Sequence, residues 1–227
     1  MSGAVHVPPA FNEPIRDYAP GSAERASLSD RLATLAKDRI EAPMVIGGER
    51  VTGDSTFPVA APHRHQHILA DVHAAGPEHV TQAIDSSLGV AAEWAATPFE
   101  DRAAIFLRAA ALLAGPWRDT INASTMLGQS KSVFQAEIDA ACELIDFWRY
   151  NVAFAERIHA EQPVSAGGAW NRMDYRALEG FVLALTPFNF TSIAANLPTA
   201  PALLGNVVVW KPSEKQAFAA HFTLELL

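Results

Sequence analysis

The pattern of hydrophobic and polar positions divides the chain into an extended start, a region of short strands, a long helical region and a closing strand-helix-strand unit. Residues 1–21 are rich in proline and small residues and have no apolar period, which predicts an arm that is ordered only by packing on other residues. Leucines at helical spacing then predict a helix over residues 27–38, with Ser27 or Ser29 as its cap.

Two short apolar runs follow, at residues 44–46 and 56–59, separated by Gly47-Gly48 and Gly53-Asp54. This pattern is typical of a strand pair. Three histidines alternate just beyond it and would lie on one side of a strand, which could suit a metal: His63, His65 and His67. No carboxylate or thiol accompanies them at short spacing, so polar surface is the preferred interpretation and no metal site is predicted.

Residues 77–162 have a helical pattern with breaks at Pro98, Gly115-Pro116 and Gly128, which predicts four helices with the longest at the end. An apolar stripe along the last helix predicts the side that lies on a core, and contains Phe134, Ile138, Cys142, Ile145 and Trp148 or Arg149. The acidic residues between them are interpreted as a solvated face: Glu137, Asp139, Glu143 and Asp146.

The period changes after a Gly/Ala loop at residues 166–169. Met173 to Arg176 suggests a short strand, and two apolar runs at 180–186 and 206–211 predict buried strands. Between them, 193–204 predicts an apolar helix broken by two prolines, and a further helix starts at 215 with Ser213 as a plausible cap. This order implies a right-handed βαβ unit and a parallel sheet, and therefore an α/β fold.

Two parallel strands cannot bury their faces alone, and the last residues, His221 to Leu227, form an apolar helix that should cover a larger sheet. We therefore expect a fragment, or a chain that needs a partner to complete it.

Composition narrows the classes of partner and compartment. The chain has 227 residues and is 49% hydrophobic, enough for a sizeable core in one or two domains. Its 17 basic and 25 acidic residues give a net charge of −8, which argues against nucleic acid. No long uncharged apolar run and no secretory pattern occurs, so we expect no membrane partner. Cys142 is the one cysteine, which predicts a reducing, cytoplasmic location.

Candidate chemistry lies where the two predicted strands end, the usual ligand site of an open α/β sheet. Asn189 follows the first strand and Lys211 ends the second. An amide held in a rigid turn can stabilise a developing alkoxide, and Lys211 with Glu214 can bind the hydroxyls of a ribose. The alternative is that Asn189 bonds its own turn and Lys211 is a solvated strand end, and spacing alone favours it. Neither a Gly-x-Gly-x-x-Gly nor a Walker-type loop occurs.

A family resemblance favours ligand binding by Asn189 and Lys211 over the purely structural alternative. Leu185-Thr-Pro-Phe-Asn-Phe-Thr191, followed by Ala200-Pro-Ala-Leu-Leu-Gly-Asn-Val-Val-Val-Trp-Lys-Pro-Ser213, resembles the aldehyde dehydrogenases, whose dinucleotide site lacks the glycine fingerprint. Phe188, where most of that superfamily has tryptophan, makes the chain most similar to the L-glutamate γ-semialdehyde dehydrogenase family. The segments Gln135 to Ala141, Glu143 to Asn151 and Leu178 to Gly180 also resemble that family.

The resemblance implies a role for each matching residue. Asn189 would donate to the oxyanion, Thr186 and Phe188 would line the nicotinamide side of NAD, and Lys211 and Glu214, with the adjacent Ser213, would hold the adenosine ribose. On the substrate side, Phe190 would flank the aldehyde chain. Glu143 would project towards the substrate entrance, although a solvated helix carboxylate is an equal alternative.

The resemblance also implies what this sequence lacks. Such enzymes need a cysteine thiolate and a glutamate that activates water, and the family carries both beyond the position of residue 227. Cys142 lies on an apolar stripe without a basic neighbour in sequence, so we expect a buried, inert thiol.

The implied fold is the amino-terminal part of an aldehyde dehydrogenase-like, Rossmann-type parallel sheet preceded by a hairpin and a helical region. We expect one incomplete NAD-binding domain over 1–227 without its catalytic domain, divided into an arm and first helix (1–42), a strand pair (43–76), helices (77–162), a loop and short strand (163–178) and the βαβ unit (179–227).

The implied activity is NAD-dependent oxidation of L-glutamate γ-semialdehyde to L-glutamate in proline breakdown, by a homo-oligomer when complete. We expect the 227-residue chain alone to be inactive and poorly stable. Two alternatives stay open: another aldehyde substrate, or a non-catalytic nucleotide-binding or oligomerisation fragment.

Overall fold

The computed structural model describes residues 6–227, which form an α/β fold as the sequence predicts. The first part contains α1 (Ala23–Lys37), β1 (Ile40–Ala42), β2 (Met44–Ile46), β3 (Glu49–Val51), β4 (Thr56–Ala61) and β5 (Arg64–His73). The helical region contains α2 (Pro77–Ala96), α3 (Phe99–Ala114), α4 (Arg118–Gln129), α5 (Val133–Ala136), the π-helical segment η1 (Glu137–Cys142) and α6 (Glu143–Ala160). The last part contains β6 (Val182–Leu185), α7 (Thr191–Leu203), β7 (Val208–Lys211), the 3₁₀ turn η2 (Glu214–Gln216) and α8 (Ala217–Leu226).

The first helix begins a turn earlier than the sequence pattern predicts. Ser22 is its cap, and its hydroxyl accepts a hydrogen bond from the backbone N–H of Arg25 at 3.2 Å. The prediction of Ser27 or Ser29 as the cap is therefore wrong. Ser27 donates to Asp119 and Ser29 donates to the carbonyl of Arg25, because both residues lie inside the helix.

The short strands pair differently from the prediction. β2 pairs with β3 across Gly47 and Gly48, and β4 pairs with β5, which β1 joins in parallel. The two glycines have φ of +61° and +81°, the conformation that a two-residue hairpin turn needs, so 44–46 pairs with its immediate neighbour instead of 56–59. His63 contacts Ser130 and His67 contacts the carbonyl of Ala36, and residues 6–227 hold no group of three candidate metal ligands.

Helices α2, α3 and α4 follow, and then α5, η1 and α6 continue one another without a gap from Val133 to Ala160. Counted as one, these three segments form the fourth and longest helix, as the pattern predicts. The prediction of its core-facing stripe is wrong at Phe134, which is 65% exposed, whereas Cys142, Ile145 and Trp148 are buried. The π-helical segment between them explains the difference, because its extra residue changes the side of the helix that later residues face. None of the helices within residues 6–227 is long and apolar enough to cross a membrane.

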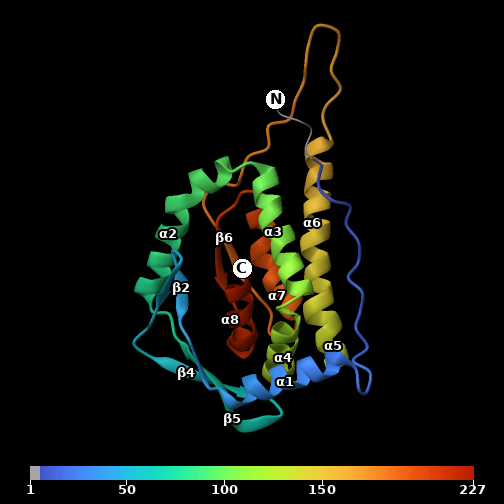
Figure 1. Cartoon of the computed structure of the whole chain (residues 1–227). Helices are drawn as coiled ribbons and strands as arrows, with labels where there is room; N and C mark the ends of the chain where they lie inside the picture. Colours follow the sequence, from blue (N-terminus) through green and yellow to red (C-terminus); the bar gives the residue numbers. More distant parts are fainter. Residues whose placement is uncertain (1–5) are drawn as a thin grey trace.

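The extended arm lies along this long helix (Figure 1). The backbone N–H of Val7 donates to Glu156, that of Glu13 donates to Asp146 and that of Arg16 donates to Glu137. These partners are spaced along the helix, so the arm runs antiparallel to it. Packing on another element is what the sequence predicts for the arm.

Glu137 lies at the centre of a buried polar cluster, so its interpretation as part of a solvated face is wrong. It is fully buried and pairs with Arg118, which is 1% exposed and also pairs with Glu13. Tyr18 and Asn122 each donate to Glu137 at 2.8 Å. Burial alone would raise the pKa of Glu137, but hydrogen bonds from Arg118, Arg16 and Tyr18 outweigh it and lower the pKa. The cluster therefore holds an ionised carboxylate in the core.

The closing unit is a parallel pair, with Val182 beside Val208 and Leu185 beside Lys211. The prediction of two buried strands is wrong. In β6, Ala184 is 3% exposed, but Leu183 and Leu185 are 54% and 61% exposed. In β7, the first three residues are half-buried and the last is exposed. Side chains of a strand alternate between two faces, and α7 packs on one of them. The strand predicted at 173–176 is also absent, because no neighbouring strand pairs with this extended segment.

The helix between these strands is continuous through Pro198 and Pro201, so the predicted break is wrong. A proline inside a helix costs a backbone hydrogen bond. Tertiary contacts offset that cost here: Ala194, Ala195 and Leu203 are buried, and the Thr199 hydroxyl accepts from the buried Trp148 indole at 3.0 Å.

Candidate functional site

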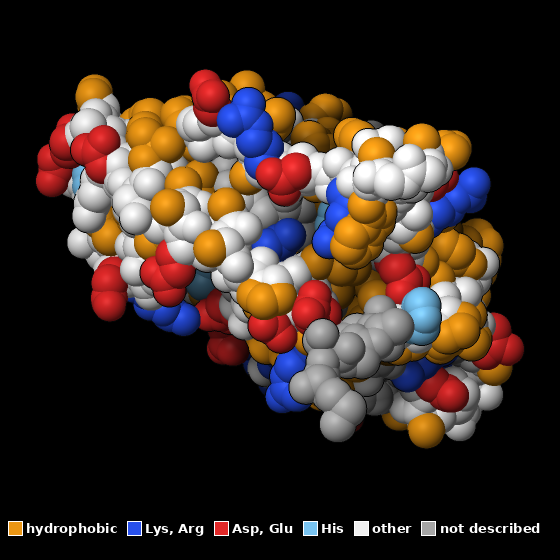
Figure 2. Space-filling view, turned by 90° about the horizontal axis from the view of Figure 1, so that it is seen from above, with side chains coloured by type: hydrophobic (Ala, Val, Ile, Leu, Met, Phe, Trp, Pro, Cys, Tyr) orange, Lys and Arg blue, Asp and Glu red, His pale blue; other side chains and the backbone are white. Residues whose placement is uncertain are grey.

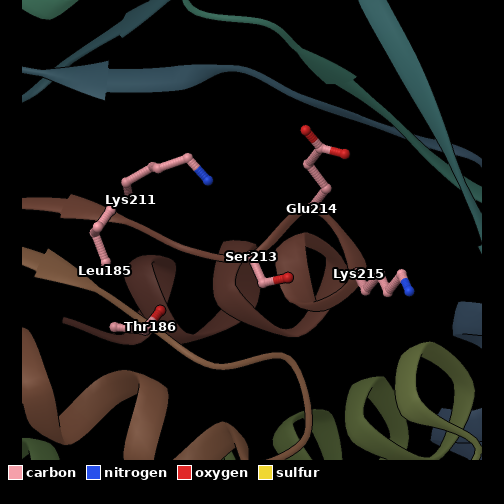
Figure 3. Close-up of a pocket in the computed structure, with 6 residues that line it drawn as sticks. All are labelled: Leu185, Thr186, Lys211, Ser213, Glu214 and Lys215. Carbon is pink, nitrogen blue, oxygen red and sulfur yellow. The ribbon is translucent and has the colours of Figure 1, made fainter.

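A cavity of about 380 Å³ lies at the carboxyl ends of β6 and β7. Its lining consists of Leu185, Thr186, Lys211, Ser213, Glu214 and Lys215 (Figure 3). Parallel pairing puts Leu185 beside Lys211, so segments from different parts of the sequence meet at one edge. The structure therefore brings together four residues that the sequence singles out: Thr186, Lys211, Ser213 and Glu214.

The charged ends of Lys211 and Glu214 extend into the space beyond the strand ends, with a gap between them (Figure 3). Both residues are exposed, and the Lys211 ammonium bonds only the adjacent carbonyl of Pro212, at 3.3 Å. No ion pair joins the two among residues 6–227. A donor and an acceptor that face the same space can bind the hydroxyl groups of a ligand. Ser213 stands at the N-cap position before η2, as the sequence predicts, but its hydroxyl makes no capping bond.

Thr186 is fixed by Trp210, a residue to which the sequence pattern assigns no role. Its side chain is 7% exposed, and its hydroxyl accepts a hydrogen bond from the Trp210 indole at 2.9 Å. Trp210 is the neighbour of Lys211 in β7. A tryptophan next to the last residue of a strand that begins with two valines is the signal that could have identified this contact, because a half-buried indole N–H needs an acceptor.

Asn189 and Phe188 lie in the turn between β6 and α7, and both are exposed. Within the described part of the chain, no hydrogen bond of the Asn189 side chain is found, so the alternative that it bonds its own turn is not supported. The Phe188 ring is 56% exposed and lies 5.8 Å from the ammonium of Lys215. The Asn189 amide is therefore free to donate to a ligand.

Phe190 is the residue before α7 and Glu143 is the first residue of α6, and neither lines the cavity. Glu143 accepts a hydrogen bond from the buried hydroxyl of Ser192, and it is half-buried. The Glu143 carboxylate is therefore neither fully solvated nor without a hydrogen-bond partner.

Two further polar side chains hold the start of α7. Thr191, which is fully buried, exchanges a hydrogen bond with Thr125 at 2.8 Å and accepts one from Gln129 at 2.6 Å. The sequence pattern assigns no role to four of these residues: Thr125, Gln129, Thr191 and Ser192. Polar residues on a helix that otherwise faces the core were the available signal, because buried polar groups need partners.

Cys142 is a buried thiol, as the sequence predicts. It is 4% exposed, and burial together with the nearby Glu137 carboxylate raises its pKa to about 12. Arg118 lies 3.2 Å from its sulfur, a contact that sequence proximity could not show. A thiol held protonated and away from solvent is a poor nucleophile.

Residues 50–227 match the aldehyde dehydrogenase family. The chain is 47% identical over 223 residues to the Delta-1-pyrroline-5-carboxylate dehydrogenase of Agaricus bisporus. The match covers 97% of this chain and 41% of that protein. It is 47% identical over 218 residues to the Homo sapiens protein named Delta-1-pyrroline-5-carboxylate dehydrogenase, mitochondrial, covering 95% of this chain and 38% of that one.

A solved structure is also similar over the whole chain. The Delta-pyrroline-5-carboxylate dehydrogenase from Mycobacterium tuberculosis bound with NAD has 57% identity and a TM-score of 0.98, and the match covers 100% of this chain and 42% of that chain. This chain therefore spans about two fifths of the length of these relatives. By its sequence match and by its fold, the chain belongs to the aldehyde dehydrogenase family.

Proposed function

We propose that the complete protein is an NAD-dependent dehydrogenase that oxidises L-glutamate γ-semialdehyde, the open form of pyrroline-5-carboxylate, to L-glutamate in proline degradation. The observation that carries the proposal is the cavity at the ends of β6 and β7, in a fold with a TM-score of 0.98 to an NAD-bound Delta-pyrroline-5-carboxylate dehydrogenase. Residues 6–227 supply the half of the site that binds cofactor and stabilises charge.

Lys211 and Glu214 are the residues that would hold NAD, through the hydroxyls of its adenosine ribose. The fit rests on their free polar ends: an ammonium donor and a carboxylate acceptor that face one cavity and do not pair with each other. Ser213 lines the same edge, and Thr186 and Phe188 would lie on the nicotinamide side. When bound, NAD supplies the hydride acceptor of the oxidation.

Asn189 would donate its amide N–H to the aldehyde oxygen as negative charge develops there. Its exposed side chain, free of internal hydrogen bonds among the described residues, suits that role because the donor need not leave another partner. Phe190 would flank the carbon chain of the aldehyde, and Glu143 would lie at the substrate entrance behind Ser192.

The thiolate that attacks the aldehyde would come from another part of the complete protein. Cys142 is the one cysteine of this sequence, and it is buried beneath the arm with a raised pKa. This observation also supports a second candidate function for the 227-residue chain, a non-catalytic nucleotide-binding or oligomerisation role. That role predicts weak NAD binding without turnover, whereas dehydrogenase activity of the purified chain would contradict it.

The absorbance of NADH measures the proposed activity directly. The complete gene product should reduce NAD when pyrroline-5-carboxylate is added. No NADH from pyrroline-5-carboxylate, together with good turnover of another aldehyde, would contradict the proposed substrate and leave the family assignment unchanged.

Replacing Lys211 with methionine or Glu214 with glutamine should raise the KM for NAD by about tenfold or more, because each change removes a hydrogen bond to or from a charged group. The KM for the aldehyde should change little. Lys37→Met removes an exposed lysine of α1 that does not line the cavity and serves as the matched control. An unchanged KM for NAD in both variants would contradict the ribose assignment.

Homo-oligomerisation and a cytoplasmic location also stay proposals. Residues 161–181 project from the body of the fold (Figure 1), and Val164, Trp170 and Leu178 are 91%, 81% and 71% exposed. Hydrophobic side chains are spread over the face seen from that side (Figure 2). Such surface favours self-association, which sedimentation of the complete protein would reveal; a monomer at all concentrations would contradict it.

Fractionation of cells would test the location, since a human relative is named mitochondrial.

A further inference from the structure

Lys131 lies in the short connection between α4 and α5 and takes no part in the site described above. The residue before it, Ser130, has a left-handed backbone with φ of +55°, and its hydroxyl contacts His63 Nδ1 at 2.8 Å. A non-glycine residue in this conformation is uncommon and is retained where surrounding contacts enforce it. The left-handed residue ends α4 and sets the direction in which Lys131 leaves the helix.

The Lys131 side chain is held by two contacts. Its ammonium donates to Asp139 Oδ2 at 2.7 Å and lies 4.0 Å from the centre of the Phe190 ring. The side chain is only 12% exposed, so little solvent screens these interactions. An ammonium at this distance over an aromatic face is attracted by the electron density of the ring. Because Asp139 fixes the ammonium, the ammonium in turn restrains the ring.

A second restraint reaches the same segment from the same long helix. Glu143 lies four residues after Asp139 and accepts from Ser192, two residues after Phe190. Thr191 between them is bound by Thr125 and Gln129. The start of α7 is thus held at three successive residues, and Lys131 is the group that acts on the ring itself.

We propose that Lys131 is a positioning residue that orients the Phe190 ring against the carbon chain of the aldehyde. With the ammonium over one face of the ring, the opposite face is the one left for the substrate chain. The inference rests on the proposed function, because it needs Phe190 to flank the aldehyde. It adds a determinant of aldehyde preference in the loop after α4, outside the segment of residues 186–214.

A double-mutant cycle in the complete enzyme tests this role. Lys131→Met should raise the KM for L-glutamate γ-semialdehyde by about tenfold with a smaller change in kcat. The reason is that the carbon chain of the aldehyde loses a contact that it makes equally in the ground state and in the transition state. Acetaldehyde, too short to reach the ring, should show no such change. In a Phe190→Leu background the same lysine substitution should have little further effect, since residues that act through one contact are not additive.

Three further variants separate orientation of the ring from a general structural role. Lys131→Arg should have a KM close to that of the wild type, because a guanidinium also stacks on an aromatic ring. Asp139→Asn, which keeps the cation but loosens it, should give an intermediate KM and covers the case in which Lys131→Met folds poorly. Lys37→Met should behave like the wild type.

Two results would overturn the role of Lys131. One is an equal rise in the KM for acetaldehyde, and the other is an undiminished effect of Lys131→Met in the Phe190→Leu background. Failure of the proposed function looks different: the wild-type enzyme itself would not oxidise L-glutamate γ-semialdehyde. The same cycle, run with a longer aldehyde that the enzyme does oxidise, then decides whether Lys131 acts through Phe190.

Discussion

Replacing Asn189 with alanine should lower kcat of the complete enzyme by about 10²–10³-fold, the usual effect of removing one oxyanion donor. The amide lies in the exposed turn directly after β6, and its side chain bonds to no other residue of the described chain. The variant therefore loses a contact that forms only with the reacting oxygen. The KM for NAD should stay close to that of the wild type, because Lys211 and Glu214 remain.

Steady-state kinetics with saturating NAD provide the measurement. Gln66→Ala is the matched control, because it removes an exposed amide from β5 that does not line the cavity, and should leave kcat unchanged. A kcat for Asn189→Ala within a few-fold of the wild type would remove Asn189 from the catalytic site and would favour a role confined to the turn.

Replacing Arg118 with methionine should lower the free energy of unfolding by about 3–5 kcal/mol, because it leaves the Glu137 carboxylate buried without its counterion. Arg118 is 1% exposed and Glu137 is fully buried, so solvent cannot replace the lost partner. The arm should loosen as well, because Arg118 also bonds Glu13 and the carbonyl of Pro14.

Chemical denaturation of the complete protein measures the loss, and hydrogen exchange of residues 13–18 measures the arm. Arg157→Met is the control, because Arg157 and Glu161 form an ion pair whose side chains are 78% and 71% exposed, and such pairs contribute little. Arg118→Met combined with Glu137→Leu should recover much of the stability, since no unpaired charge remains. Equal stability of Arg118→Met and the wild type would contradict the buried pair.

The same cluster predicts a direction of pH dependence. The pKa of Glu137 is lower in the folded state than in the unfolded chain, where a glutamate titrates near about 4.3. Its stabilisation is therefore complete above that unfolded value and is lost as the pH falls below it towards the folded pKa. Unfolding measured from neutral pH downwards should show this loss in the wild type and a smaller one in the Arg118→Met, Glu137→Leu double variant.

Local patterns in the sequence were sufficient for the helices and for the βαβ unit. Helical spacing and breaks at Pro98 and Gly115 define helices whichever residues they later contact, and two aliphatic runs around a helix imply a parallel pair. The failed predictions about strands share one cause: the pairing of 44–46, the burial of 180–186 and the strand at 173–176 each depend on which partner lies alongside. A strand pattern predicts that a segment can pair, but it does not identify the strand with which the segment pairs.

The candidate site divides in the same way. Thr186, Lys211 and Glu214 meet at one cavity because their positions at strand ends follow from topology. Glu137 was misread because its partner Arg118 lies 19 residues away on a different helix, and an acidic residue on a helix is usually solvated. Trp210 and Lys131 were missed because their partners, Thr186 and Phe190, are adjacent only after folding.

A crystal structure of the complete protein with NAD tests the central claim most directly. The ribose hydroxyls of the adenosine should lie within hydrogen-bond distance of Lys211 and Glu214, with the nicotinamide beside Thr186 and Phe188 and the Asn189 amide facing the reaction centre. NAD bound at a different place, with the cavity at the ends of β6 and β7 unchanged and free of ligand, would contradict the claim.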